Sequence, residues 1–155
     1  MQVLDKIKAT LKKAFTDGWS VKKLTQSFCT GIYIAFSPFP GLHTGMMFAA
    51  KFLFKLNFPI LFLATSFNNP WTMVAFYSFD YFFGYWLIHT FLGFNPTWTI
   101  SLARIFGSGK ICIWSFLVGG NILGLLFAFA FYTPVYFLFK GLVKKFKKNY
   151  ENNKL

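Results

Sequence analysis

Acidic residues are scarce in this sequence. The 155 residues include four Asp or Glu against sixteen Lys or Arg, and 55% of the chain is hydrophobic. Charged residues make up 13% of the chain, compared with about 25% in typical soluble domains. So few charges cannot cover the surface of a soluble protein, so the composition favours a membrane protein. The length has room for one domain, residues 1–155.

Metal-binding and redox motifs are also missing. Cys29 and Cys112 are too far apart for a CxxC motif, so we interpret them as small buried hydrophobes. His43 and His89 have no second His, Glu or Cys at the spacing of a ligand set, and His89 is expected near a membrane interface. The sequence therefore predicts no metal site and no cofactor.

Groups for acid–base catalysis are equally few. Asp80 is the only acidic residue inside the apolar part of the chain, and only His43 could work with it. An intramembrane enzyme needs a nucleophile, or an acid and a base within reach of each other. We therefore predict no catalytic residues, and an intramembrane enzyme is the least favoured functional class.

Positive charge is abundant and lies at the two ends of the chain. The net charge is +12, with six lysines in residues 1–23 and six in residues 140–155. Cytoplasmic segments of membrane proteins are enriched in Lys and Arg, so both termini are predicted to be cytoplasmic. Residues 1–19 fit an amphipathic surface helix on anionic membrane lipids or a solvated topology signal, and residues 140–155 fit a basic cytoplasmic tail. No nucleic-acid-binding motif accompanies the lysines, so nucleic acid is not expected as a partner.

Polar segments containing proline interrupt two long apolar stretches. We name Ser37–Thr44 the first break and Asn68–Thr72 the second break. In hydrocarbon every backbone N–H and C=O needs a partner, so unwound backbone is stable only inside protein or beside a water-filled cavity. The pattern predicts an all-α integral membrane protein with two broken-helix or re-entrant hairpin units, residues 20–57 and 58–94. Two full crossings and one re-entrant hairpin would place both termini on one side.

Cap residues and prolines indicate where the helices begin and end. Ser20 is predicted to cap a helix over residues 21–36, and the chain becomes helical again over residues 42–54. Phe58-Pro59 is expected to begin the next helix, because proline is tolerated in a first turn. Residues 71–94, after the second break, form a helix long enough to cross a membrane.

The last apolar segment is the clearest transmembrane helix. It covers residues 111–139, follows an interfacial connector over residues 98–107, and is long enough to span with tilt or a kink. Its small-residue face lets helices approach closely and consists of Gly119, Gly120, Asn121 and Gly124. This face fits either packing within the bundle or homo-oligomerisation, and the sequence leaves both open.

The breaks supply the candidate substrate-binding residues. These are Ser37, Pro40, Gly41, His43, Thr44, Asn68, Asn69, Pro70 and Thr72. One interpretation is structural, because hydroxyls and amides satisfy unwound backbone. The other is a midplane site, where the N-termini of the helices after the breaks attract an anionic group. His43 fits a neutral helix cap, a proton relay or a contact for a lipid headgroup.

Two charged residues lie at similar distances after the breaks. Lys51 follows the first break and Asp80 follows the second. An ionised Asp at the centre of a membrane costs about 2.5–3.5 kcal/mol, so it needs a partner or water. The alternatives are a structural ion pair between Lys51 and Asp80, a functional relay, or an interfacial position.

The two breaks also carry a family resemblance. Between about Gly31 and Gly84 the chain resembles the small bacterial membrane proteins known as domain of unknown function twenty-sixty-two. The residues that carry the resemblance are Gly31, Phe36-Ser37-Pro38, Pro40-Gly41, His43-Thr44, Leu56-Asn57-x-Pro59, Asn69-Pro70-x-Thr72, Tyr77 and Gly84. The resemblance implies a bacterial inner-membrane protein and carries over no reaction. Relatives joined to cell-envelope enzymes imply, by association, an envelope or lipid context.

These observations lead to two functional hypotheses. The first is a small transporter-like or lipid-handling protein of the inner membrane, with an anionic or amphipathic substrate bound where the breaks meet. The alternative is a non-catalytic membrane scaffold or anchor for a cell-envelope enzyme. The breaks would be essential in the first case and tolerant of change in the second.

Overall fold

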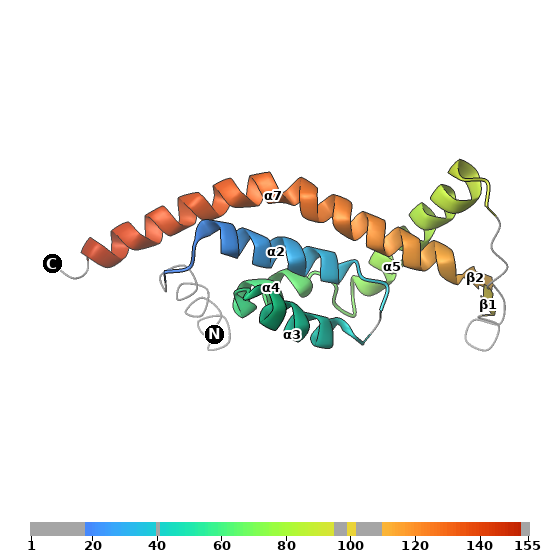
Figure 1. Cartoon of the computed structure of the whole chain (residues 1–155), viewed down its shortest axis with the longest axis horizontal. Coiled ribbons are helices and arrows are strands. Elements are labelled where there is room, and N and C mark those ends of the chain that lie inside the picture. The colour runs from blue at the N-terminus through green and yellow to red at the C-terminus, as the bar shows by residue number, and fades with distance from the viewer. Residues whose placement is uncertain (1–17, 40, 95–98, 102–109, 153–155) are drawn as a thin grey trace.

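The computed structural model describes residues 18–39, 41–94, 99–101 and 110–152 (Figure 1). In order along the chain its elements are α2 (Val21–Ala35), α3 (His43–Phe54), α4 (Phe58–Thr65), α5 (Met73–Tyr85), the π-helix η1 (Trp86–Phe91), the strands β1 (Thr99–Ser101) and β2 (Lys110–Cys112), and α7 (Ile113–Asn152). The described part is helical apart from these two short strands, so the all-α prediction is confirmed. Most of the predicted N-terminal surface helix lies outside the described residues.

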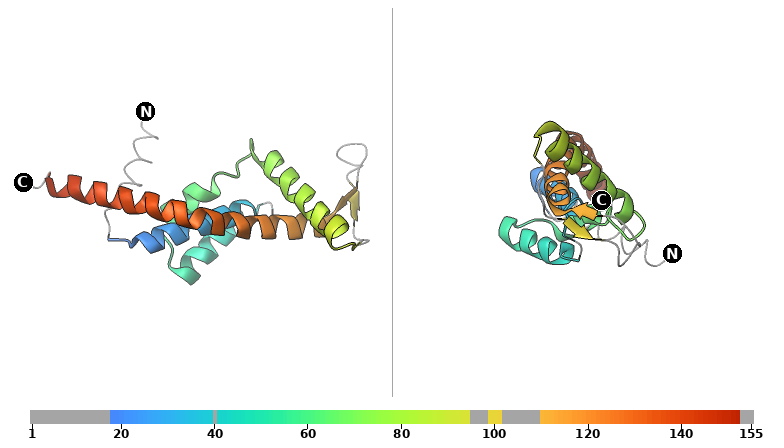
Figure 2. Two further views of the ribbon diagram at one scale, coloured as in Figure 1. Left: turned by 90° about the horizontal axis from the view of Figure 1, so that it is seen from above. Right: turned by 90° about the vertical axis from the view of Figure 1, so that its right-hand side faces the viewer.

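The helix α7 runs along the length of the molecule. The helices α2, α3 and α4 lie on one side of it, and α5 with η1 crosses it near its N-terminal end (Figure 1). α2 contacts α7 on one side and both α4 and α3 on the other. α5 packs against the N-terminal part of α7, and seen from above it crosses α7 at an angle (Figure 2). α2 is therefore the layer between α7 and the α3–α4 pair.

The predicted helix ends agree with cap hydrogen bonds. The Ser20 side chain accepts a hydrogen bond from the Lys23 backbone N–H at 3.2 Å, which caps α2. The Asn57 side chain accepts from the Ile60 N–H at 3.2 Å and caps α4 at the predicted position. Lys55 ends α3 in the left-handed region, with φ 50°.

Removing the cap of α2 should have a measurable effect on stability. Ser20→Ala is expected to lower the free energy of unfolding by about 1 kcal/mol, because one N–H of the first turn loses its acceptor. Unfolding of the detergent-solubilised protein followed by circular dichroism would measure the loss. Ser78→Ala, at an exposed position inside α5, is the matched control and should change stability by less than about 0.5 kcal/mol.

Three predicted segments differ from the structure. The helix expected over 71–94 is α5 followed by the wider turns of η1, which end at Phe91. Of the connector expected over 98–107, the structure describes residues 99–101, which form β1 and pair antiparallel with β2, with Ile100 opposite Ile111. The helix expected over 111–139 begins at Ile113 and continues through Pro134 to Asn152 as α7. The described part of the basic tail, residues 140–152, is thus a continuation of α7.

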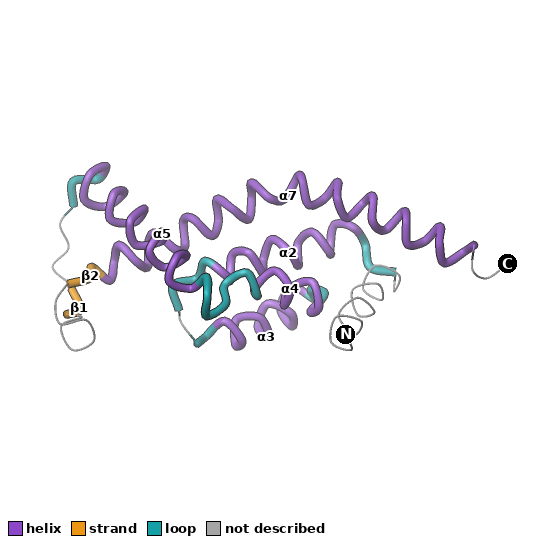
Figure 3. The backbone as a smooth tube through the Cα atoms, turned by 180° about the vertical axis from the view of Figure 1, so that it is seen from behind, coloured by secondary structure: helices purple, strands orange, loops and turns teal. Residues whose placement is uncertain are grey.

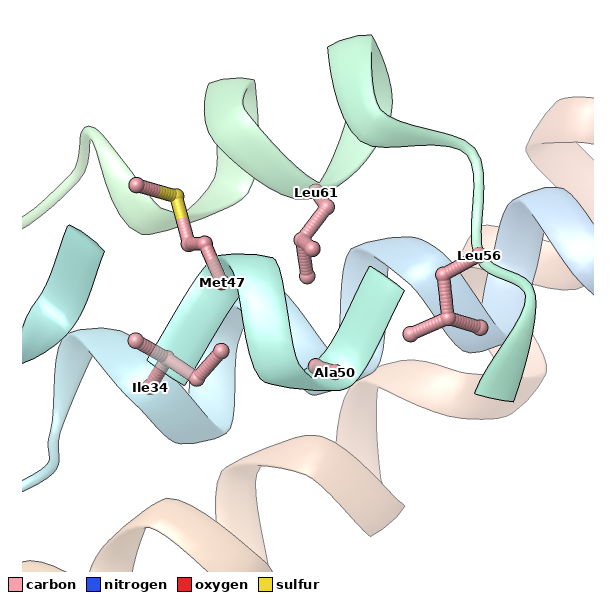
Figure 4. Close-up of a cluster of buried hydrophobic side chains, with 5 residues drawn as sticks. All are labelled: Ile34, Met47, Ala50, Leu56 and Leu61. Carbon is pink, nitrogen blue, oxygen red and sulfur yellow. The ribbon is translucent and has the colours of Figure 1, made fainter. Parts of the chain in front are cut away.

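The buried core is divided into small clusters between the helices. One consists of Ile34 from α2, Met47 and Ala50 from α3, Leu56 from the following turn and Leu61 from α4 (Figure 4). A second joins Leu24 and Ile60 to Val135 and Phe139 of α7. Packing of α3 and α4 on α2, and of α2 on α7, therefore holds the hairpin formed by α2 and α3 in place.

Large apolar side chains also cover much of the exterior. Trp71 is 94% exposed, and the other large hydrophobic residues with at least about two thirds exposure are Phe52, Leu53, Val74, Phe82, Phe91 and Phe129. Several polar side chains lie inside instead, among them Ser27, Ser37, Asn57, Thr65 and Asp80. Among the described residues one helical segment, Ile113–Phe146, is long and apolar enough to cross a membrane. So many exposed large apolar side chains are unusual for a soluble domain, where exposed apolar patches are small.

Candidate functional site

The second break contacts the end of α2, close to the start of the first break. The Asn68 side-chain amide, from the second break, donates a hydrogen bond to the carbonyl oxygen of Ala35 at 2.6 Å. Ala35 is the last residue of α2, two residues before the first break begins at Ser37. The rings of Phe36 and Phe76 pack edge to face beside this contact, with centroids 4.8 Å apart. Figure 3 shows both breaks as loop segments near the same end of α2 and α4.

The side chains of the second break satisfy its own backbone. The Asn69 carboxamide oxygen accepts hydrogen bonds from the backbone N–H groups of Trp71 at 2.9 Å and Thr72 at 3.2 Å. The Thr72 hydroxyl donates to the Phe67 carbonyl at 2.6 Å. Pro70 is exposed in the turn between them. Asn69 and Thr72 thus have the structural role considered above, because their side chains replace helix hydrogen bonds that the proline interrupts.

The first break is a turn that one buried serine and one histidine hold together. Ser37 is fully buried, and its hydroxyl contacts the Met46 sulfur at 3.4 Å. His43 Nε2 lies 3.2 Å from the Ser37 carbonyl oxygen. Gly41 has φ 83°, a conformation that favours glycine. Thr44 is exposed at the start of α3, and Pro40 lies outside the described residues.

The small-residue face of α7 packs within the chain. A Cβ on Gly120 would lie 2.6 Å from the Phe36 carbonyl oxygen, and a Cβ on Gly124 would lie 3.0 Å from the Tyr33 ring. Asn121 accepts a hydrogen bond from the Tyr33 hydroxyl at 2.7 Å. Gly119 faces the backbone of α5. Close approach of α7 to both α2 and α5 therefore occupies all four residues of the predicted face.

Asp80 lies inside the contact between α5 and α7. Its side chain is fully buried, and neither carboxylate oxygen has a hydrogen-bond partner among the described residues. The Oδ2 atom lies 3.3 Å from the position that a Cβ on Gly120 would take, and the Phe36 carbonyl oxygen lies 2.6 Å from the same position. The Pro38 Cδ atom lies 3.1 Å from the same position, so Asp80 borders the first break as well as α7.

Lys51 and Asp80 are not paired in the structure. The Lys51 ammonium lies over the rings of Phe52 and Phe58, 5.3 and 5.4 Å from their centroids. α3, which carries Lys51, packs on α2 and α4, whereas Asp80 faces α7. The ion-pair hypothesis is therefore corrected, because α2 lies between the two charges.

The comparison with known families agrees with the resemblance at the breaks. The family model DUF2062, described as an uncharacterized protein conserved in bacteria, matches residues 5–148. The chain belongs to this family. No curated protein and no solved structure matches it. The family match extends well beyond the breaks and includes most of α7.

A second feature of this DUF2062 protein is a groove along α2. It has a volume of about 360 Å³ and lies between α2, the end of α3 and α7. Its lining includes Gln26, Thr30, Phe54, Leu125 and Phe129. At one end it adjoins a smaller pocket of about 270 Å³ that shares Gln26, Thr30 and Phe54 and reaches Lys23, whose ammonium donates to the Phe54 carbonyl at 2.9 Å. The groove thus runs from a basic end into an apolar interior.

The sequence analysis did not identify this groove. Gln26, Thr30 and Tyr33 lie four and three residues apart, a spacing that places them on one face of a helix. That polar stripe within an apolar segment was the one feature of the sequence that could have indicated the groove. The partners on α3 and α7 could not be found, because pairing between distant helices has no local signature.

Proposed function

We propose that this chain is a small multi-pass protein of the bacterial inner membrane, transporter-like or lipid-handling, whose site lies where the two breaks meet. The observation that supports it is the hydrogen bond from Asn68 of the second break to Ala35, two residues before the first break, which brings the two breaks close together. Interrupted helices of transporters place unwound backbone at their substrate site. In a chain with an apolar exterior, two such interruptions in contact are best explained by a site, because each one has a cost in hydrocarbon.

The helix lengths support two crossings and a re-entrant hairpin. α2 and α3 have 15 and 12 residues, or about 22 and 18 Å, which is short of a hydrocarbon core of about 30 Å. Their basic ends meet, since Lys23 contacts the Phe54 carbonyl. We assign α4, the second break, α5 and η1 to one interrupted crossing and α7 to the other. Both termini are then cytoplasmic, as the lysine distribution predicts.

The substrate we propose is anionic or amphipathic. α3 and α5 both begin at a break, and neither has a side-chain hydrogen bond from its N-cap residue. The first N–H groups of such helices attract anions. Along α7, Gly120 contacts the first break and lies near the N-terminal end of the helix. The site is therefore expected closer to that end of α7 than to the midplane. The groove along α2 offers an apolar chain a separate place to bind.

Cysteine accessibility would test the site. In a variant without Cys29 and Cys112, single cysteines at Thr44 and Thr72 are expected to react in membrane vesicles with a maleimide that does not cross membranes. The reaction needs water, so lipid-facing positions react far more slowly. The matched controls are Phe48, one turn further along α3, and Val74, two residues after Thr72. These residues are 46% and 69% exposed but would face lipid. We expect reaction at least about tenfold faster at the threonine positions, corresponding to about 1.4 kcal/mol.

The outcomes separate the functional hypotheses. Protection of Thr44 and Thr72 by vesicles containing phosphatidylglycerol, or by inorganic phosphate, would identify the substrate class. If the threonine positions are as unreactive as the controls, water does not reach the breaks and their role is structural. That result would favour the alternative hypothesis, a scaffold for a cell-envelope enzyme. The hydrogen bonds of the Asn69 and Thr72 side chains to backbone groups fit that alternative. Rapid reaction at Val74 would contradict the membrane placement itself.

A further inference from the structure

Asp80 is a buried acid beside which the described part of the chain places no cation. Its side chain is fully buried and its two oxygens have no hydrogen-bond partner among the described residues. Lys51, the basic residue on the neighbouring hairpin, lies over aromatic rings instead. An acidic residue inside a membrane protein is costly when ionised and is by default a functional residue. Among the described residues no cation neutralises this carboxylate.

The surroundings of Asp80 favour a neutral carboxyl. The Phe36 carbonyl, at the C-terminal end of α2, borders the same space above Gly120 as the Asp80 Oδ2 atom. The C-terminal end of a helix carries partial negative charge, which opposes a second negative charge and attracts a positive one. α7 faces α5 there with Ser115, Gly119 and Gly120, none of which is charged.

The titratable groups nearby do not supply the missing charge. On α5 itself, the Tyr77 hydroxyl interacts electrostatically with Asp80. In the first break, His43 contacts the Ser37 carbonyl. On α2, Lys22 and Lys23 lie in the first turn, at the end of the helix opposite to Phe36. The carboxylate thus faces a phenol, carbonyl oxygens and glycines.

We propose that Asp80 is a proton-binding site of this protein and exchanges its proton with water through the breaks. In the protonated state the carboxyl is neutral and can donate a hydrogen bond toward the carbonyl oxygens at the end of α2. Release of the proton leaves a carboxylate that must be hydrated or paired with a cation. The role of this proton rests on the proposed function: a protonated Asp80 lets an anionic substrate bind at the breaks without a second negative charge beside it. Substrate and proton would then bind together.

Infrared spectroscopy of the full chain in lipid would test the proton site. The protein is expected to show the carbonyl stretching band of a protonated carboxylic acid at neutral pH, where ordinary carboxyls are ionised, and the band should disappear in alkaline buffer. Asp80→Asn, which keeps the size of the side chain, should remove the band. Asp17→Asn should retain it, because Asp17 lies in the basic N-terminal segment that is proposed to face the cytoplasm.

A second measurement does not depend on how well the Asn variant folds. The hydrophobic reagent dicyclohexylcarbodiimide adds to protonated carboxyls in apolar surroundings, and mass spectrometry of the wild-type chain locates the product. We expect modification at Asp80 that decreases as the pH rises. Absence of both the infrared band and the modification at every pH would overturn the proposal. A band that persists in strongly alkaline buffer would also overturn it, because the proton would then be permanent and structural.

The two experiments distinguish failure of the proposed substrate site at the breaks from failure of the proposed proton site at Asp80. A titrating Asp80 together with unreactive cysteines at Thr44 and Thr72 would retain the proton site and remove the substrate site. If the cysteines at Thr44 and Thr72 react and are protected by the lipid or phosphate, but Asp80 is ionised at every pH, the substrate site would be retained and the proton site removed.

Discussion

Gly119→Ala is expected to destabilise the protein by about 3 kcal/mol or more, because the new methyl group has no space. The Cβ of residue 119 would meet the backbone carbonyl of Asp80 and lie 2.9 Å from the backbone nitrogen of Gly84. Both neighbours are backbone atoms of α5, so no side chain can move aside. The two helices would have to separate. Gly84→Ala should have a similar effect, since its Cβ would meet the Ser115 carbonyl of α7.

The matched control lies in the same helix. Gly141 also belongs to α7, but a Cβ there has nothing within 4 Å. Alanine is a better helix former than glycine, so Gly141→Ala should stabilise the protein by up to about 1 kcal/mol. Thermal unfolding of the purified protein in mild detergent would compare the two variants. Equal effects of the two substitutions would contradict the close contact of α5 and α7.

This comparison also decides between the two uses of the small-residue face. If the face packs within one chain, the loss of stability in Gly119→Ala is independent of protein concentration. If instead it mediates a homodimer, the loss depends on concentration, because association is a mass-action equilibrium. The contacts of Gly120 with Phe36 and of Asn121 with Tyr33 support packing within the chain.

Much of the local structure could be predicted from the sequence because its causes are local. Ser20 and Asn57 cap α2 and α4 at the expected residues. Both helix breaks coincide with prolines, which lack a backbone donor and disfavour helix in the preceding residue. The extent of α7 was harder to predict. The sequence predicts a helix that ends at residue 139, yet α7 continues through Pro134 to Asn152 and includes the start of the basic tail.

Features that depend on distant contacts could not be predicted. Nothing near Trp86 indicates the π-helix η1, and the strands β1 and β2 are too short to show alternation. The pairing of Lys51 with Asp80 was inferred from similar spacing after the two breaks. It was wrong because spacing along the chain does not show that α2 lies between α3 and α7. The contact of the two breaks, in contrast, depends on Asn68, which was identified as a candidate residue.

Asn68→Leu should separate the breaks and lower the free energy of unfolding by about 3 kcal/mol, because it leaves the Ala35 carbonyl without its donor. Carbonyls in the last turn of a helix have no partner within the helix. Asn68 supplies that partner at 2.6 Å, and in a chain with an apolar exterior water cannot easily replace it. Chemical unfolding in mixed micelles would measure the loss.

The control for Asn68 is a bond whose removal leaves nothing unsatisfied. The Ser66 hydroxyl donates to the Phe62 carbonyl at 2.7 Å, but the Ser66 backbone N–H donates to the same oxygen at 3.0 Å. Ser66→Ala should therefore cost less than about 0.5 kcal/mol. Asn68→Leu should also expose the first break, so that a cysteine at the buried Ser37 position reacts with maleimide faster than in the parent chain. A loss of stability without this exposure would mean that Asn68 supports α2 alone and that the breaks do not form one site.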